Sequence, residues 1–141
     1  MKRKLFLVGL VLALVLFLVG CNGSGVIIPA TDEAKIRGVI NNFCIAVSNQ
    51  DWNLAQSYYY PDSAGYSALE QLENLFNSYP QQTGVTMSIT PTIYSINIVG
   101  NEATVLVSYY VQMCYQGDCE SVSGEKQTQV LIKSGGKWYL I

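Results

Sequence analysis

The apolar residues of this 141-residue chain recur with three different spacings along the sequence. Residues 5–20 form an apolar run that contains no charged side chain. Between residues 31 and 79 the apolar positions return every three or four residues, which is the period of an amphipathic helix. After Gly84 the period becomes two, as in strands with one buried face. The pattern predicts an apolar leader and then an α+β domain, in which N-terminal helices pack on a mainly antiparallel sheet.

The helical region divides into three predicted helices. The first has a one-sided apolar stripe, made of Ile36, Val39, Ile40, Phe43, Cys44 and Val47. Asp51 is suited to cap a second helix, which must end before Pro61. Ser67 and Glu70 have the spacing of a capping box, so we expect the third helix to begin there.

The alternating region predicts about four antiparallel strands. Residues 85–90 alternate up to Pro91, and residues 92–99 continue as a strand. The later strands are expected at residues 104–112, 127–133 and 137–141. The order of helices followed by strands is that of an α+β domain.

The apolar leader predicts export. Three basic residues precede the apolar run, which is the arrangement of a secretory signal peptide. A transmembrane helix and a buried core helix are the alternatives. The run is shorter than the ~20 residues that cross a bilayer, and it lacks the polar face of a core helix.

The end of the leader resembles the lipobox of bacterial lipoproteins, in the sequence Leu18-Val19-Gly20-Cys21. The resemblance implies that Cys21 is acylated, for example with palmitate, and becomes the first residue of the mature chain. We therefore expect a signal peptide at residues 1–20, a lipidated cysteine and flexible tether at 21–30, and the folded domain at 31–141. The domain would then be held on a membrane, facing the periplasm or the cell exterior.

The charges of the mature chain exclude one class of partner. Residues 21–141 carry five basic and ten acidic side chains, a net charge of −5. Nucleic-acid binding requires clustered Lys and Arg, so it is not expected. Electrostatic adhesion to anionic lipid is not expected either, so the acyl group on Cys21 must anchor the protein to the membrane.

The remaining cysteines predict one disulfide. Cys114 and Cys119 flank residues 115–118, which look like a four-residue hairpin loop, and export exposes them to oxidising conditions. Cys44 lies within the helical stripe, where a buried free thiol is the usual outcome. The chain contains no histidine to complete a zinc site, so we expect neither a metal nor a cofactor.

Several short motifs resemble the nuclear transport factor 2-like superfamily, which includes SnoaL-like and ketosteroid-isomerase-like domains. They occur at residues 49–55, 60–61, 100–105 and 136–140. The resemblance implies a curved, mainly antiparallel sheet wrapped around the helices as a cone, often with a cavity at its wide end. Isomerases and dehydratases share this fold, but a fold alone does not establish catalysis.

The catalytic residues of those enzymes are not found here. Isomerase-like members use a helical tyrosine with an inward aspartate, and dehydratase-like members use histidine. The first predicted helix has no tyrosine, no predicted strand contains an aspartate, and histidine is absent. We therefore expect a non-enzymatic protein, with an isomerase- or dehydratase-like enzyme as the least favoured alternative.

Tyrosine is the most distinctive side chain of the domain, and it supplies the candidate pocket. The candidate residues are Trp52, Tyr58, Tyr59, Tyr66, Tyr94, Tyr109 and Tyr110. They fit either a small apolar or aromatic ligand in the cone, or ordinary core packing and an exposed sheet face. The first hypothesis is an envelope lipoprotein that contacts another protein, or pairs as a homodimer, through its sheet face. The alternative is a binder of small ligands.

Overall fold

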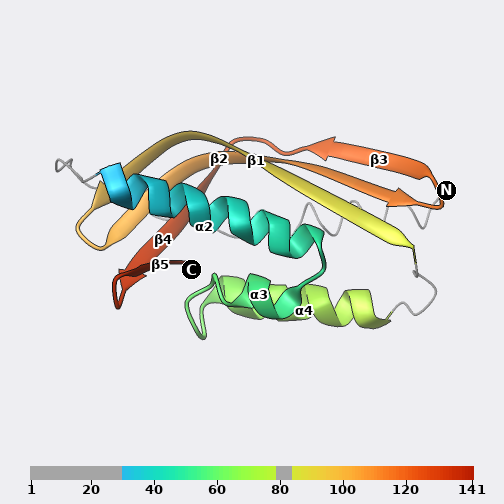
Figure 1. Cartoon of the computed structure of the whole chain (residues 1–141), viewed down its shortest axis with the longest axis horizontal. Coiled ribbons are helices and arrows are strands. Elements are labelled where there is room, and N and C mark those ends of the chain that lie inside the picture. Colours follow the sequence, from blue (N-terminus) through green and yellow to red (C-terminus); the bar gives the residue numbers. More distant parts are fainter. Residues whose placement is uncertain (1–29, 79–83) are drawn as a thin grey trace.

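The computed structural model describes residues 30–78 and 84–141, in which three helices pack against one five-stranded sheet (Figure 1). The elements are α2 (Ala30–Ser48), α3 (Trp52–Gln56), α4 (Ala64–Ser78), β1 (Val85–Val99), β2 (Glu102–Tyr115), β3 (Asp118–Ser123), β4 (Gln127–Ser134) and β5 (Lys137–Leu140). This order confirms the predicted α+β class. The predicted signal peptide, Cys21 and residues 22–29 of the predicted tether lie outside the described residues, while Ala30, the last residue of the predicted tether, begins α2. Within the described ranges, no helix has the length and hydropathy needed to span a membrane.

The helices follow the sequence pattern, with one exception at the start of α4. The Asp51 carboxylate accepts a hydrogen bond from the Leu54 amide at 3.1 Å, which confirms Asp51 as the cap of α3. The capping box at Ser67 was a wrong prediction, because α4 already begins at Ala64. The Ser63 hydroxyl accepts a hydrogen bond from the Tyr66 amide at 3.2 Å and thereby supports the first turn of α4.

The sheet is built around β2. One edge of β2 pairs with β1 along its whole length, while the other pairs first with β4 and then with β3. β5 completes the order β1-β2-β4-β5, and all these pairs are antiparallel. Pro91 is accommodated within β1 because β1 lies at the edge of the sheet. In Figure 1, β1, β2 and β3 arch over α2, whereas β4 runs down past α2 to β5, which lies below α2 in that view, as α3 and α4 do.

The disulfide between Cys114 and Cys119 joins β2 to β3, as predicted. The turn is tighter than expected, since Tyr115 pairs with Asp118 and only Gln116 and Gly117 remain in the loop. Both loop residues have positive φ, 53° and 90°, which is the conformation of a two-residue hairpin turn. β3 was not predicted, because its polar sequence lacks the alternation of apolar residues that marks a buried strand.

The core consists of two neighbouring clusters. In the first, Ile36, Ile40 and Cys44 of α2 face the inward side chains of the sheet, including Trp138. Cys44 is a buried free thiol, as the helical stripe indicated. The second cluster joins the end of α2 to α3, α4 and Met87. The helical stripe therefore holds the helices against the concave side of the sheet.

An ion pair fixes the start of α2 to the far end of the sheet. The Asp32 carboxylate, in a residue only 9% exposed, accepts hydrogen bonds from Lys133 Nζ at 2.8 Å and Trp138 Nε1 at 3.3 Å. The hydrogen bond from Lys133, followed by that from Trp138, holds the pKa of Asp32 below its ordinary value. This contact ties the first turn of α2 to β4 and β5.

Candidate functional site

The connection between α3 and α4 forms an isolated β-bridge with β5. The Tyr60 amide donates to the Leu140 carbonyl at 2.7 Å, and the Leu140 amide donates to the Tyr58 carbonyl at 2.8 Å. The bridge between Tyr59 and Leu140 is parallel. Tyr59 packs against the first core cluster, whereas Tyr60 contacts Tyr139 of β5.

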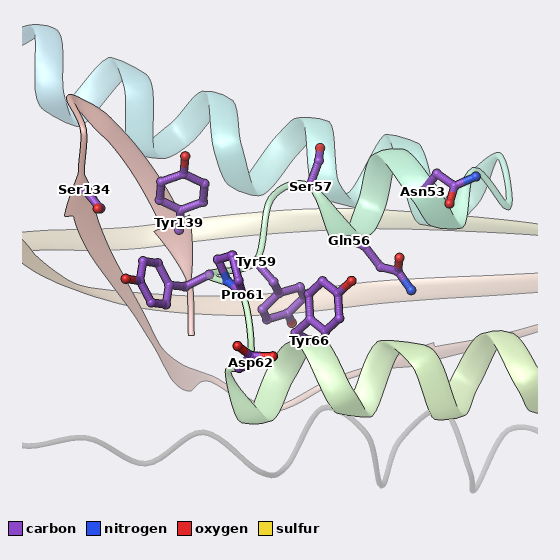
Figure 2. A pocket seen from close by; sticks show the side chains of 10 residues that line it. Asn53, Gln56, Ser57, Tyr59, Pro61, Asp62, Tyr66, Ser134 and Tyr139 are labelled. Atoms are coloured by element: carbon purple, nitrogen blue, oxygen red, sulfur yellow. The ribbon is translucent and has the colours of Figure 1, made fainter.

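A groove with a volume of about 530 Å³ lies beside this β-bridge (Figure 2). Its walls come from α3, the α3–α4 connection, the start of α4 and the β4–β5 hairpin. The lining residues are Asn53, Gln56, Ser57, Tyr59, Tyr60, Pro61, Asp62, Tyr66, Ser134 and Tyr139. Segments far apart in the sequence therefore supply a single concave surface.

Tyrosine rings form much of the groove. Tyr60 and Tyr139 pack edge to face, with ring centroids 5.9 Å apart and an angle of 79° between the rings. Figure 2 shows the rings of Tyr59 and Tyr66 beside each other, with Asp62 at the lower edge. Asp62 has a left-handed backbone, with a φ of 61°, and it is the one lining residue with a formal charge. The groove is thus aromatic and weakly acidic.

The Tyr59 ring is positioned by contacts with α2 and α4. Phe43 of α2 packs against the Tyr59 ring at a right angle, with centroids 5.3 Å apart. In α4, a Cβ atom on Gly65 would lie only 2.0 Å from Tyr59 Cε1. The absence of a side chain at Gly65 is therefore what lets the Tyr59 ring sit between α2 and α4.

Burial keeps the thiol of Cys44 and the phenols of Tyr59 and Tyr109 in their neutral forms. Burial raises the pKa of the Cys44 thiol to about 12. Burial, and secondarily the neighbouring Cys44, also raises the pKa values of Tyr59 and Tyr109 above their ordinary range. A neutral thiol and neutral phenols are poor nucleophiles and poor bases, so this interior favours packing over acid–base chemistry.

The structure separates the predicted pocket residues into three groups. Tyr59 and Tyr66 line the groove. Trp52 and Tyr109 belong to the core clusters, and Tyr58 packs against both clusters. The exposed residues Tyr94 and Tyr110, 47% and 43% exposed, lie on the sheet apart from the groove.

Two aromatic residues of the groove were absent from the predicted set. Tyr60 and Tyr139 each lie within one of the family-like motifs, at residues 60–61 and 136–140, but neither was selected as a pocket residue. Their contact depends on the parallel pairing of the α3–α4 connection with β5, which no local pattern reveals. The polar lining residues include Asn53, Gln56 and Asp62. In the sequence they could be recognised only as polar positions of a short helix and of the turn that follows it, which does not indicate a groove.

No group of three or more acidic, cysteine or histidine side chains able to hold a metal ion occurs in residues 30–78 and 84–141. The groove has one carboxylate, on Asp62, which is too few for a dedicated metal site. Its lining is better suited to contact with an organic group, through ring faces, amides and hydroxyls.

Comparison with known proteins identifies the architecture. No protein-family model and no curated protein matches the chain. Among solved structures, one described as an NTF2-like protein with a cystatin-like fold, from Novosphingobium aromaticivorans, is similar with a TM-score of 0.62 and 14% identity. The match covers 79% of this chain and 78% of that one. This chain has the nuclear transport factor 2-like fold.

Two further structures with this fold are similar to the chain. A putative scytalone dehydratase from N. aromaticivorans has a TM-score of 0.63 and 14% identity, over 78% of this chain and 79% of its own. The Aln2 structure from a Streptomyces species has a TM-score of 0.66 and 8% identity, over 82% and 89%. At these identities the likeness establishes the nuclear transport factor 2-like fold and leaves activity to be argued from the site.

Proposed function

We propose that this nuclear transport factor 2-like chain is an exported lipoprotein, anchored through Cys21, which works by non-covalent binding in the tyrosine groove. The observation that carries the proposal is the groove itself, in which four tyrosines from three segments meet. Tyrosine offers a large, rigid contact area together with a hydroxyl group, and serines, Asn53 and Gln56 add adaptable hydrogen bonding. This combination is typical of surfaces that recognise other molecules.

Attachment to a membrane is supported by the sequence of the leader and by the disulfide. The lipobox-like sequence precedes Cys21, and residues 22–25 are small or polar, as in a flexible tether. The disulfide between Cys114 and Cys119 is consistent with an oxidising compartment. The proposed arrangement places the groove outside the cytoplasm, within reach of envelope components.

Binding is favoured over catalysis by the chemistry of the site. The groove contains one carboxylate, Asp62, and the phenol of Tyr59 is held neutral by burial. The free thiol of Cys44 is buried, and its raised pKa disfavours the reactive thiolate. The lining residues supply no second carboxylate to pair with Asp62, as the two-carboxylate arrangement of acid–base catalysis would need.

A second candidate function is protein contact through the sheet face. Tyr94 and Tyr110 are 47% and 43% exposed there, and the Tyr94 hydroxyl lies 3.1 Å from the Ser108 hydroxyl. Lys126 Nζ lies 4.2 Å from the centre of the Tyr94 ring. Exposed aromatic rings beside a basic group are common in protein interfaces, including those of homodimers.

Photo-crosslinking in the producing cell separates the two candidates. A photoreactive amino acid is placed at Asn53 or Ser57 beside the groove, or at Tyr110 on the sheet face. The groove proposal predicts adducts from Asn53 and Ser57 and none from Tyr110. Adducts confined to Tyr110 would support the sheet face instead, and the absence of adducts from Asn53 and Ser57 contradicts binding in the groove.

A further inference from the structure

We infer that the tyrosine groove recognises an organic cation, specifically a quaternary ammonium group of the kind found in choline. This inference rests on the proposed binding function and adds the chemical class of the ligand. It follows from the ring arrangement, the charges around the groove and the behaviour of aromatic rings elsewhere in the molecule.

The ring arrangement suits a bulky cation. The face of an aromatic ring carries negative charge density and attracts a cation within about 6 Å of its centre. Tyr60 and Tyr139 stand at 79° to each other, so they present two differently oriented surfaces at one end of the groove. The ring of Tyr66 lies further along the groove, beside that of Tyr59, which is packed against Phe43 (Figure 2). Several rings around one site are how proteins bind ammonium groups that have no N–H to donate.

The charges around the groove have the complementary sign. Asp62 contributes a carboxylate, and no lysine or arginine is among the lining residues. A second carboxylate, that of Glu73, accepts a hydrogen bond at 3.4 Å from the lining residue Gln56. Lys137 pairs with Ser134, so it lies on the same face of the β4–β5 hairpin and flanks the groove without lining it. Within the lining itself, a cation meets the Asp62 carboxylate and ring faces.

The same molecule already places its own cations on aromatic rings. Lys126 Nζ lies 4.2 Å from the centre of the Tyr94 ring, and Lys133 Nζ lies 5.7 Å from that of Trp138. The rings of the groove have no such partner, because none of the five lysines and arginines of residues 21–141 lines it. An external cation would fill the place that an internal lysine takes on Tyr94.

The test is a titration of the full exported protein, purified from membranes in an uncharged maltoside detergent. Choline chloride is the probe, and its neutral carbon analogue, in which a tert-butyl group replaces trimethylammonium, is the matched comparison. Binding is measured by saturation-transfer NMR at low salt. The inference predicts saturable choline binding and an analogue at least about tenfold weaker, because the analogue keeps the shape and loses the charge.

Variants then locate the binding. Tyr139→Leu is expected to weaken choline binding about three- to fivefold, while Tyr139→Phe, which keeps the ring, stays within about twofold of wild type. Asp62→Asn is expected to weaken binding about threefold, and its charge-matched control Glu125→Gln to leave it unchanged. Tyr115→Leu, at the β2–β3 hairpin, is the matched aromatic control. Thermal melts of each variant confirm that the comparison is made between folded proteins.

Three results would overturn the inference: no choline binding, equal binding of the neutral analogue, or equal loss from Tyr139→Leu and Tyr115→Leu. The proposed function fails separately. If a neutral molecule binds the wild type and is lost in Tyr139→Leu, the groove remains a binding site and the cation class is wrong. If no ligand or partner is sensitive to Tyr139→Leu, binding in the groove is wrong as well.

Discussion

Gly65→Ala tests how the groove is built, because the structure predicts an effect opposite to the usual one. Gly65 lies in the first turn of α4, and replacing a helical glycine by alanine ordinarily stabilises a protein by about 0.5–1 kcal/mol. Here the added Cβ atom would lie 2.0 Å from Tyr59 Cε1, 2.7 Å from Cδ1 and 2.8 Å from Cζ. Carbon atoms in contact ordinarily stay about 3.5–4.0 Å apart.

Two sets of contacts restrain the Tyr59 ring against moving away from this clash. The ring packs on Phe43 at 5.3 Å, and the backbone of the residues on either side of Tyr59 is hydrogen-bonded to Leu140. Overpacking of this kind costs about 1–3 kcal/mol, which exceeds the helix-propensity gain. We expect a net loss of about 1–2 kcal/mol, or a Tm lower by about 4–8 °C for a domain of this size.

Urea unfolding followed by circular dichroism measures the effect. Gly38→Ala in α2 is the matched control, since no atom lies within 4 Å of its added Cβ, and we expect it to be neutral or stabilising. In a Tyr59→Ala background the cost of Gly65→Ala should largely disappear, because the clashing ring is gone. A Gly65→Ala protein as stable as wild type, or an unchanged cost in the Tyr59→Ala background, would refute this account of the ring's position.

Three further predictions concern charge, the disulfide and the anchor. Because the folded pKa of Asp32 lies below the ordinary value of 3.8, its carboxylate stabilises the fold above that pH, and the contribution is lost as the pH falls through the folded value. Asp32→Asn should therefore lower the urea midpoint at neutral pH and converge with wild type in acid; a difference independent of pH would contradict this. Replacing Cys114 and Cys119 by serine should cost about 2 kcal/mol, and intact-mass analysis of wild type should show one disulfide, not three free thiols. Cys21→Ser should release the protein from membranes in a fractionation experiment, and continued retention would rule out the lipid anchor.

The fold was largely predictable because its signals are local. The stripe from Ile36 to Val47 predicted α2, and the change of period after Gly84 predicted the strands. The errors arose where a weak local signal competed with a stronger neighbour. Ser63 supports the first turn of α4 before the Ser67 box is reached, and β3 is held by pairing with β2 and the disulfide rather than by an apolar pattern.

The groove was only partly predictable because it is assembled from distant segments. The sequence identified Tyr59 and Tyr66 as candidates, yet it also selected Tyr94 and Tyr110, which lie apart from the groove. The spacing of apolar residues can assign a tyrosine only to one face of the helix or strand in which it lies. It does not show that the α3–α4 connection pairs with β5, which is what brings Tyr139 into the groove.

The central claim is that the tyrosine groove is a binding site, and native mass spectrometry of the exported protein, purified gently from membranes, tests it most directly. We predict an additional bound mass on the wild-type protein whose occupancy is unchanged in Tyr115→Leu and reduced in Tyr139→Leu. Equal occupancy of that mass on the wild-type and Tyr139→Leu proteins, or a wild-type protein that carries none, would contradict the claim.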